Sequence, residues 1–372
     1  MLNDINFSLS ELSVLNVERA IADIKNSLAI VVKHEHNFTS LVISAEYFNT
    51  NHIKLLKKLE FNNLQLLISS NRANYLSNSK KFVYPVSIIL NINDIDSINL
   101  ITTSETSLNF QEYNFTQTSN EYNASLHLMK IAELLPAAII VNIDCNNQYL
   151  SKWLNTNRIS IIDHTEIMHC LENNASLLQE ICRAPLKLKY TPNAEIVAFR
   201  ATTGGKEHYA LIIGDLSTSP TPLVRIHSSC YTGDLLTSLM CDCGDQLTTA
   251  IQYMASDKEN AGIILYLMQE GRGIGFINKL RTYVLQSKGL DTVEANEAWG
   301  FDDDERPFIY ACQILNLLNV KKVRLLSNNP QKAVSLKEGG IEILEVLPHK
   351  AKKNPYNNLY LKTKAEKLGH KL

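Results

Sequence analysis

The sequence KKVRLLSNNPQKAVSLKEGGIEILEVL, residues 321–347, reads as a strand, a helix and a second strand in succession. We predict the strands at 321–327 and 341–347. Ser327 or an asparagine would cap the helix between them, Pro330 would lie in its first turn, and Gly339 would end it. Strands joined through a helix in this way run parallel in one sheet, so this stretch predicts a βαβ unit.

The rest of the chain shows the same mixture of strands and helices. A further strand is predicted at 263–267, followed by a helix at 277–289 that stops at Gly289. In the first half, apolar runs predict strands at 28–32, 41–45, 86–92 and 137–143, and helical periodicity predicts helices at 51–60 and 122–135. The sequence therefore predicts an α/β (α+β) two-domain protein, with mixed sheets and flanking helices in both halves.

Glycine divides the 372-residue chain into two unlike halves. All 14 glycines lie at or after Gly204. Because glycine allows tight turns and close approach of the backbone to a ligand, we expect the ligand site in the second half. Chain length alone predicts two or three domains of about 150 residues each. A basic, extended stretch at 183–193, bracketed by prolines, marks the boundary and gives predicted domains at 1–184 and 185–372.

The composition argues against several classes of protein. With 36 basic and 38 acidic residues, the formal net charge is −2, so no strong field would attract nucleic acid or an anionic membrane. No apolar run reaches the roughly 18 to 20 residues that cross a bilayer, and the acidic N-terminus MLNDINFSLSELS does not resemble a signal peptide. We therefore expect a cytoplasmic protein whose seven cysteines are reduced thiols or metal ligands.

Three of the cysteines, Cys230, Cys241 and Cys243, fall within 14 residues in the polar sequence HSSCYTGDLLTSLMCDCGDQ. Thiolates are zinc ligands, and no fourth Cys or His lies at the spacing of a zinc finger. Three protein ligands leave one position for water, as in hydrolytic zinc sites. The alternative is three unrelated buried cysteines. A core position is what we expect of the four isolated ones, Cys145, Cys170, Cys182 and Cys312.

Other motifs of the second half could contact a phosphorylated ligand. The loop EGRGIG at 270–275 follows a predicted strand, so its backbone amides and Arg272 could face a phosphate, and a plain strand-to-helix turn is the equal alternative. Lys332, in the first turn of its helix, could do the same. By composition alone, FDDDERPF at 301–308 is a surface acidic turn. Tyr283 lies on the apolar face of its helix, which favours a core position.

Together these motifs closely resemble GTP cyclohydrolase II, the enzyme family that opens riboflavin biosynthesis. The likeness runs from about residue 187 to the end and rests on VRIHSSC, CDCGDQL, QEGRGIGFINKLRTYVLQSKGLDTVEAN, GFDDDER, RLLSNNPQK and YLKTKAEKLGH. The resemblance implies a hydrolase acting on a cyclic amidine, which opens the imidazole ring of GTP and releases formate and pyrophosphate. The remaining product is a diaminopyrimidinone ribosylamine phosphate. It also implies one Zn²⁺ per chain, Mg²⁺ with the triphosphate, and a homodimer.

The resemblance also implies roles for individual residues. It implies that Cys230, Cys241 and Cys243 bind the zinc. It implies Asp304 as proton acceptor, Arg306 as the group that attacks the α-phosphorus, and Tyr283 as a helper near the zinc. The implied GTP contacts are Arg225, Ile226, His227, Ser228, Ser229, Gln246, Glu270, Gly271, Arg272, Thr292, Ser327 and Lys332.

The chain departs from the family pattern at four positions. Ser229 stands where the family usually has an acid, Met240 and Met268 stand where it has arginines, and Ser327 replaces a threonine. Charged hydrogen bonds contribute about 1.5–3 kcal/mol each, so the lost arginines would weaken GTP binding if both contacted phosphate. The alternative function is therefore a catalytically weakened nucleotide-binding or regulatory homologue of the same fold.

The first half resembles, more faintly, 3,4-dihydroxy-2-butanone 4-phosphate synthase, the domain that precedes the cyclohydrolase in bifunctional riboflavin proteins. The likeness runs through VERAIADIKNSLAIVV, LHLMKIAELLPAAIIVNI and ISIIDHTEIMHCLENN. The synthase has an acidic metal-binding loop after its first strand, but here that place reads KHEHNFTS, in which only Glu35 is acidic. His34 and His36 could bind a metal, although exposed loop histidines are the commoner case. We therefore expect a degenerate, non-catalytic domain, with a bifunctional enzyme as the third alternative.

Overall fold

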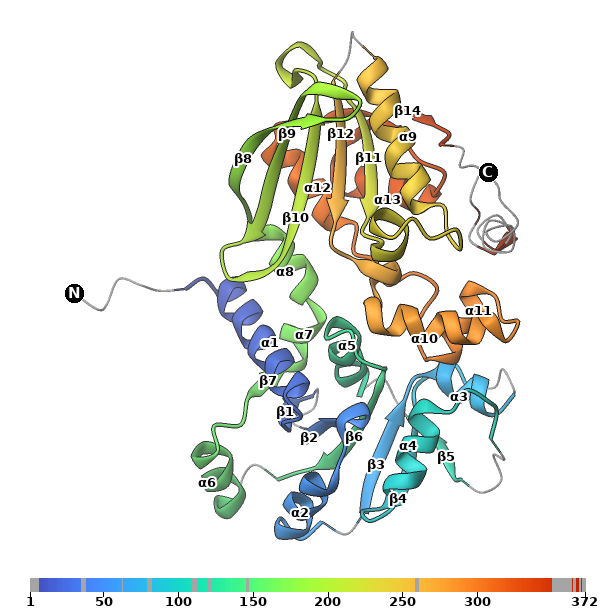
Figure 1. Ribbon diagram of the computed structural model, residues 1–372. Coiled ribbons are helices and arrows are strands. Elements are labelled where there is room, and N and C mark those ends of the chain that lie inside the picture. The colour runs from blue at the N-terminus through green and yellow to red at the C-terminus, as the bar shows by residue number, and fades with distance from the viewer. Residues whose placement is uncertain are drawn as a thin grey trace, which may run out of the picture. The chain divides into compact units, whose positions relative to one another are not determined.

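A computed structural model describes residues 7–349 except 35–37, 62, 79–81, 109–112, 119–121, 145–146 and 258–260, together with Thr363, Glu366, Lys367 and Gly369. The chain forms two compact units, whose elements are labelled in Figure 1. Unit 1 comprises Met1–Cys170 and Ile277–Glu305, and unit 2 comprises Leu171–Phe276 and Arg306–Leu372. The predicted domains 1–184 and 185–372 are the regions that resemble two different families, and the units are defined by contacts instead. The predicted domain division stays a prediction.

Unit 1 is built on a seven-stranded mixed sheet in the order β5-β4-β3-β6-β2-β1-β7. Neighbouring strands are antiparallel except β1 and β7, which are parallel. The strands are β1 (Ile30–Lys33), β2 (Thr39–Ser44), β3 (Asn63–Ile68), β4 (Val86–Asn91), β5 (Phe115–Gln117), β6 (Ala137–Asn142) and β7 (Ile161–Asp163). The four strands predicted in the first half are β1, β2, β4 and β6, and all four are confirmed.

Helices cover both faces of this sheet, because successive residues of a strand point to opposite faces. Val31, Leu41 and Leu66 pack on one face with α2 (Thr50–Lys58), α3 (Ser70–Leu76), α4 (Ile95–Thr103) and α6 (Gln148–Thr156). Ile30 and Val42 pack on the other face with α1 (Leu9–Lys25), α5 (Asn123–Ile131) and α7 (His164–Met168). The predicted helices at 51–60 and 122–135 correspond to α2 and α5.

Unit 1 also contains residues 277–305, which follow most of unit 2 in the sequence. They form α10 (Phe276–Ser287) and α11 (Thr292–Ala298), so the helix predicted at 277–289 is confirmed. Its predicted apolar face is wrong: Asn278 is fully buried while Leu280 is 42% exposed. The reason is a polar contact, since the Asn278 amide donates to the Glu133 carbonyl (2.9 Å). Tyr283 is accordingly half-buried and not a core residue.

Unit 2 is built on a second seven-stranded mixed sheet, in the order β14-β13-β11-β12-β10-β9-β8. The pairs β13–β14, β11–β13 and β11–β12 are parallel, and the pairs involving β10, β9 and β8 are antiparallel. The strands are β8 (Leu178–Leu188), β9 (Thr191–Ala201), β10 (Gly204–Ile213), β11 (Leu223–Ser228), β12 (Gly262–Leu267), β13 (Lys322–Leu326) and β14 (Glu342–Leu347).

The predicted βαβ unit is confirmed as β13, α13 (Pro330–Glu338) and β14. Asn329 is the cap, since its side chain accepts a hydrogen bond from the Gln331 amide. Val224 and Ile263 pack on one face of the sheet with α12 (Ile309–Leu317) and α13. Ile264 packs on the other face with α9 (Cys243–Ser256). The remaining helix, α8 (Cys170–Ser176), precedes β8. Both halves therefore have the predicted α/β architecture.

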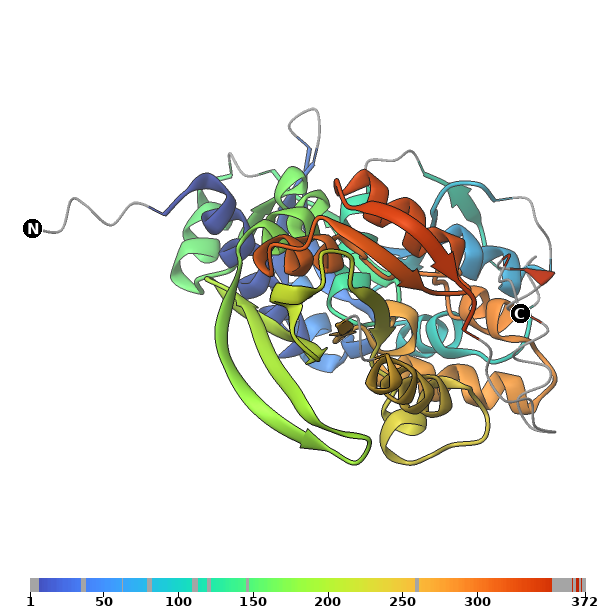
Figure 2. The same ribbon diagram turned by 90° about the horizontal axis from the view of Figure 1, so that it is seen from above.

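The sheet of unit 2 ends in a long hairpin of β8 and β9, coloured green in Figures 1 and 2. Residues 183–193, expected to be an extended stretch, form most of its outer part. Cys182 on β8 is exposed, so its predicted core position is wrong, whereas Cys170 and Cys312 are buried as expected. Cys145 lies outside the described residues. None of the helices in the described ranges is long and apolar enough to span a bilayer.

Candidate metal and nucleotide site

The candidate site lies where three parallel strands of unit 2 end. β11 ends at Ser228, β12 at Leu267 and β13 at Leu326. The carboxyl ends of parallel strands meet at one edge of a sheet, and ligands of open α/β sheets bind there. The three loops that follow these strands contain the cysteine cluster, the glycine loop and the start of α13, so the fold brings together motifs that are distant in sequence.

Cys230, Cys241 and Cys243 form a compact group of thiols. Their three Sγ atoms lie within 4.8 Å of one another, and those of Cys230 and Cys241 are 3.7 Å apart. Thiolates bound to one zinc at about 2.3 Å in tetrahedral geometry would be about 3.8 Å apart. In the described part of the chain, no other group of three His, Cys, Asp or Glu side chains converges in this way. The donors and their spacing therefore fit a zinc ion.

The backbone around the thiols holds them close together. Cys230 is followed by a π-helical turn, η6 (Tyr231–Leu235), and the Gly233 amide donates to the Cys230 Sγ (3.3 Å). A Cβ at Gly233 would lie 2.8 Å from the Cys241 Sγ, so only glycine fits against the cluster. The hydrogen bond to Cys230 raises the pKa of Cys241 to about 11. Cys241 thus stays protonated at neutral pH unless a cation displaces its proton.

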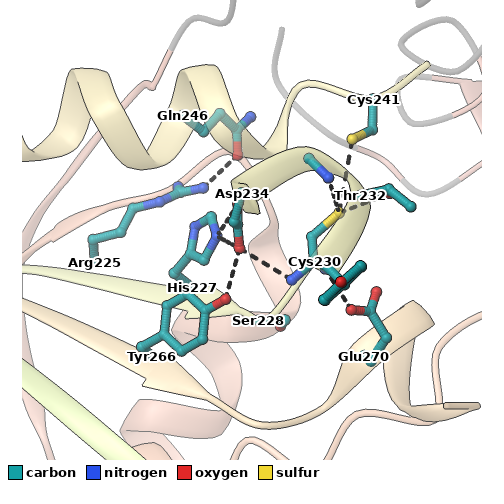
Figure 3. A network of polar contacts seen from close by, with 12 residues as sticks. Arg225, His227, Ser228, Cys230, Thr232, Asp234, Cys241, Gln246, Tyr266 and Glu270 are labelled. Atoms are coloured by element: carbon teal, nitrogen blue, oxygen red, sulfur yellow. Dashed lines mark hydrogen bonds and ion pairs between the residues drawn. The ribbon is translucent and has the colours of Figure 1, made fainter. Parts of the chain in front are cut away.

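Asp234, in the turn η6, holds the cluster to the sheet (Figure 3). Its carboxylate accepts hydrogen bonds from the His227 Nε2 (3.1 Å), the Tyr266 hydroxyl (2.9 Å) and the Cys230 amide (3.0 Å). His227 is buried against the Tyr266 ring, and burial lowers its pKa. Burial and the Asp234 charge raise the pKa of Tyr266. One carboxylate therefore joins β11, β12 and the first cysteine.

A chain of polar contacts links β11 to the helix that begins at Cys243. The Arg225 guanidinium donates to the Gln246 Oε1 and to the Leu326 carbonyl (3.2 Å). The Gln246 amide in turn donates to the Asp242 carboxylate (2.6 Å). Burial lowers the pKa of Arg225 to about 10, so Arg225 keeps its charge at neutral pH. Its Nε atom is buried and has no hydrogen-bond partner in the described structure.

Two more cations lie at the ends of these strands. Lys332, 6% exposed, donates to the Ile226 carbonyl (2.7 Å). Arg306 donates to the Ser228 hydroxyl (3.2 Å), which also accepts from the Gln269 amide (2.9 Å). Both cations lie over the ring of Phe308, at 5.6 and 5.1 Å from its centroid. A shared aromatic platform of this kind holds two positive charges close together, which suits a multiply charged anion.

The glycine loop adopts a conformation that few residues tolerate. Within the turn η7 (Glu270–Gly273), Gly271 and Arg272 have φ of 62° and 61°. A left-handed arginine costs conformational energy and is characteristic of functional sites. The Glu270 carboxylate accepts from the Tyr231 amide (2.6 Å) and from the Gly271 amide (3.1 Å). Glu270 therefore joins the glycine loop to the turn that follows Cys230.

The remaining predicted residues fall into two groups. In unit 2, Ser229 is buried and its amide donates to the Leu267 carbonyl (2.8 Å), and the buried Ser327 hydroxyl accepts from the Asn329 amide (3.1 Å). Three predicted residues belong to unit 1: Tyr283, Thr292 and Asp304. Thr292 opens α11 and accepts from the Gln286 amide (3.1 Å), and Tyr283 lies 5.7 Å from the Lys279 ammonium.

Sequence reasoning missed several residues that organise the site. Asp234 lies within the sequence of the cysteine cluster and Phe308 ends the stretch at 301–308, but neither these two residues nor Tyr266 show a recognisable spacing of ligands or catalytic groups. Their roles depend on pairing between strands, which a single sequence does not show. The one available signal for Asp234 is its place in the polar sequence between Cys230 and Cys241.

The loop after β1 in unit 1 differs from the expectation of exposed histidines. His34 is 5% exposed, its Nε2 lies 2.7 Å from the Ser40 hydroxyl, and its ring contacts Phe38 and Tyr122. That expectation is therefore wrong for His34, because the ring packs among aromatic side chains. Glu35 and His36 lie outside the described residues.

Comparison with known proteins identifies the family. The family model of GTP cyclohydrolase II matches residues 179–348. A GTP cyclohydrolase-2 of Buchnera aphidicola is 49% identical over 180 residues, which are 48% of this chain and 92% of that protein. The chain belongs to the GTP cyclohydrolase II family. A GTP cyclohydrolase-2 of Azospirillum brasilense is 41% identical over 247 residues, 66% of this chain and 64% of that protein. This chain thus spans slightly less than two thirds of that relative.

Two other similarities extend the comparison. A riboflavin biosynthesis protein of Vibrio vulnificus is 49% identical over 176 residues, which are 47% of each chain. GTP cyclohydrolase II relatives therefore include a protein named for riboflavin biosynthesis. Among solved structures, a two-domain 3,4-dihydroxy-2-butanone 4-phosphate synthase from A. baumannii has 15% identity and a TM-score of 0.31, covering 90% of this chain and 99% of that one.

Proposed function

We propose that this chain is a zinc-dependent GTP cyclohydrolase II of riboflavin biosynthesis. It would convert GTP into a diaminopyrimidinone ribosylamine phosphate, formate and pyrophosphate. The observation that carries the proposal is the thiol triad of Cys230, Cys241 and Cys243 beside buried cations at the ends of parallel strands. Family membership supports the substrate, and the spacing of the thiols supports the metal. The family resemblance also supports a cytoplasmic homodimer.

The three thiols would hold one zinc and leave one coordination position open. When bound, zinc would supply Lewis-acid activation for hydrolysis of the guanine imidazole ring. The protein's own part is to fix the thiols: η6 is tied to the sheet by Asp234, and Cys243 starts α9, whose N-terminal dipole stabilises a thiolate. The ligands would therefore be preorganised before a metal arrives.

The buried cations would bind the triphosphate together with magnesium. Arg225 and Lys332 would supply charge that stays fixed, because both are held by backbone carbonyls. Arg306, in contact with Ser228, would act at the α-phosphorus, and Asp304, two residues before it, would accept a proton. Tyr283 would assist near the zinc. Ring opening and phosphate chemistry would thus use different side chains.

The test is direct: the purified chain is incubated with GTP, Zn²⁺ and Mg²⁺, and formate and pyrophosphate are measured. We expect both products, with about one zinc bound per chain. Cys241→Ser should lose most of the zinc and the formate together, because two thiols and a hydroxyl form a much weaker site. Cys312→Ser, at a buried thiol of α12, is the matched control. Full zinc in the Cys241 variant would contradict the metal assignment.

A second candidate function is a nucleotide-binding homologue that turns over poorly. The observation in its favour is that Met240 and Met268 occupy positions where the family usually has arginines, and both are partly exposed. Such a protein would bind GTP and zinc but release formate only slowly. Isothermal titration with GTP beside the formate assay distinguishes the two, since tight binding without product would favour the homologue.

A further inference from the structure

The cyclohydrolase region does not pack as one body. The family match covers residues 179–348, yet residues 277–305 within it belong to the compact unit formed with Met1–Cys170. This segment, which we call the catalytic segment, contains Tyr283, Thr292 and Asp304, to which the proposed function gives roles. The contacts that hold it to residues 1–170 therefore bear on the site, although none of those residues belongs to the family match.

Arg72 is the centre of these contacts. Its side chain is 2% exposed, and its guanidinium donates to the carbonyls of Ile101 (3.0 and 2.9 Å), Ser104 (2.9 Å) and Ala298 (2.6 Å). Ile101 and Ser104 lie at the C-terminal end of α4, and Ala298 is the last residue of α11. One buried guanidinium thus donates hydrogen bonds to carbonyls at the C-terminal ends of two helices. One helix, α4, belongs to residues 1–170, and the other, α11, belongs to the catalytic segment. The Trp299 ring covers it at 5.3 Å.

The turn after α11 fits closely against α3. The Ser69 hydroxyl donates to the Gly300 carbonyl (2.7 Å), and the Asn71 amide donates to the Phe301 carbonyl (2.8 Å). Gly300 has a φ of +91°, and a Cβ there would lie 2.7 Å from the Ser69 Oγ and 3.1 Å from the Pro136 Cγ. Phe301 is fully buried. Side chains at the start of α3 therefore hold the backbone of the catalytic segment in one position.

Ion pairs also join the catalytic segment to residues 1–170. Lys130 on α5, whose side chain is 17% exposed, pairs with Asp302 (2.6 Å) and Glu305 (2.7 Å). Burial lowers the pKa of Lys130, but the two carboxylates outweigh burial and raise it. Arg281 pairs with Glu46 (2.8 Å). Asp302 is 63% exposed, so solvent screens its pair with Lys130, whereas Glu305 and Glu46 are 16% and 12% exposed. Removing one partner of such a buried pair leaves an uncompensated charge.

We propose that residues 1–170 act as a docking platform that fixes the catalytic segment, with Arg72 as its central positioning residue and Lys130 securing the acidic turn at 302–305. The catalytic consequence rests on the proposed function. Glu305 directly precedes Arg306, and Ile277 directly follows the glycine loop and Phe276, so the segment is joined to the site at both ends. Its docking therefore limits the positions that Asp304 and Tyr283 can take.

The platform is an addition to the family region. The Buchnera relative has 92% of its length in a match that covers 48% of this chain, so it has no room for a counterpart of residues 1–170 as well. In this chain, residues 1–170 contact the family region around Arg72. A single chain of such a relative cannot make these contacts. The first half lacks the acidic metal-binding loop of the synthase, and holding the catalytic segment would explain why its fold is retained.

The test compares two substitutions with matched controls in the full chain. Gly300→Ala places a methyl group against Ser69 and Pro136, and Gly289→Ala is its control, since Gly289 has a similar φ of +104° but open space around it. Lys130→Asp reverses a charge at the platform, and Lys322→Asp does so at the exposed Lys322–Glu342 pair of unit 2. Adding Asp302→Lys to Lys130→Asp restores opposite charges and should rescue docking.

Hydrogen exchange of peptides from 277–305 is the main readout. We expect exchange at least about tenfold faster in Gly300→Ala and Lys130→Asp, which corresponds to about 1.4 kcal/mol of lost docking. Zinc content should stay normal, and kcat for formate release should fall more than KM rises. Lys322→Asp should match the wild type. Gly289→Ala should show only the smaller effect of the left-handed backbone strain that it shares with Gly300→Ala. The Lys130–Asp302 swap should recover most of both effects of Lys130→Asp.

Each outcome decides a separate point. Unchanged exchange in both platform variants would overturn the docking role. Faster exchange with wild-type kcat would overturn the positioning role. No formate from the wild-type chain would contradict the proposed function instead, because the exchange measurement needs neither GTP nor turnover.

Discussion

Met240 and Met268 are the two residues at which this site differs most in charge from its family. They are 43% and 38% exposed, and the resemblance to the family implies arginines at these positions. If these positions face the triphosphate, Met240→Arg together with Met268→Arg should lower the KM for GTP several-fold, because each charged hydrogen bond contributes about 1.5–3 kcal/mol before solvent screening. The measurement is steady-state formate release against GTP concentration.

Met168→Arg is the matched control, because Met168 is 43% exposed but lies in unit 1 on α7. It should leave the KM unchanged. An equally unchanged KM in the double variant would mean that Met240 and Met268 only pack, or that Arg225, Arg306 and Lys332 already saturate the phosphates.

At the scale of single residues, the sequence predicts the candidate metal ligands better than the residues that hold them in place. Cys230, Cys241 and Cys243 are recognisable because thiols at this spacing in polar surroundings have few other uses, and the structure groups them. Asp234 and Tyr266 could not be predicted, since their contacts depend on how β11, β12 and η6 pair. The core position predicted for Cys182 is wrong because Cys182 lies on the edge strand β8, where all residues from 179 to 185 are exposed.

Among the elements, the turn η6 depends on a single glycine. The structure leaves no space for a Cβ at Gly233, which would lie 2.8 Å from the Cys241 Sγ and 3.1 Å from the Cys230 Sγ. Gly233→Ala should therefore spread the thiols and lower zinc affinity by tenfold or more, about 1.4 kcal/mol, although all three ligands remain. Competition with a chromogenic chelator measures this affinity. Gly340→Ala, with open space around it, should leave zinc affinity at the wild-type value.

Strand β10 contributes a pH-dependent contact. His208 is 3% exposed, and its Nδ1 accepts a hydrogen bond from the Met268 amide (3.1 Å) at the start of the glycine loop. Burial, with a smaller effect of Lys206, lowers the pKa of His208 from 6.5 to about 4. Between these values the unfolded chain binds a proton that the folded chain excludes. The free energy of unfolding should therefore fall as the pH decreases through this window, by up to about 1.4 kcal/mol per pH unit from this residue.

His208→Asn isolates this contribution, because asparagine can still accept from the Met268 amide but does not titrate. Urea unfolding at several pH values between 4 and 6.5 should give a shallower pH dependence for the variant than for the wild type. Parallel curves would show that His208 titrates alike in the folded and unfolded chains.

The elements themselves were largely predictable, because hydrophobic periodicity reports burial directly. Hydrophobic patterns predict seven of the strands: β1, β2, β4, β6, β12, β13 and β14. The face of α10 was not, since Asn278 is buried by a hydrogen bond to the Glu133 carbonyl. A polar residue that is satisfied by a distant backbone group looks the same in the sequence as one that faces water.

For the whole molecule, packing and sequence order divide the chain differently. Residues 277–305 belong to the family region by sequence but to unit 1 by contact. The contact is made by groups such as Arg72 and Ala298, which are 226 positions apart. No local sequence pattern predicts a contact between residues so far apart. Arg72 donates to backbone carbonyls, so no acidic residue in the sequence indicates its partners.

The last prediction concerns the activity that the first half resembles. A synthase acting on ribulose 5-phosphate must hold magnesium between carboxylates to stabilise an enediolate. In this chain Lys33–His36 contains one acid, and His34 is buried beside Phe38 and Tyr122. The full chain should therefore form no butanone phosphate from ribulose 5-phosphate at any magnesium concentration, while its formate release from GTP serves as the internal control. Synthase turnover in the same preparation would restore the bifunctional alternative, and residues 1–170 would then have a catalytic role besides docking.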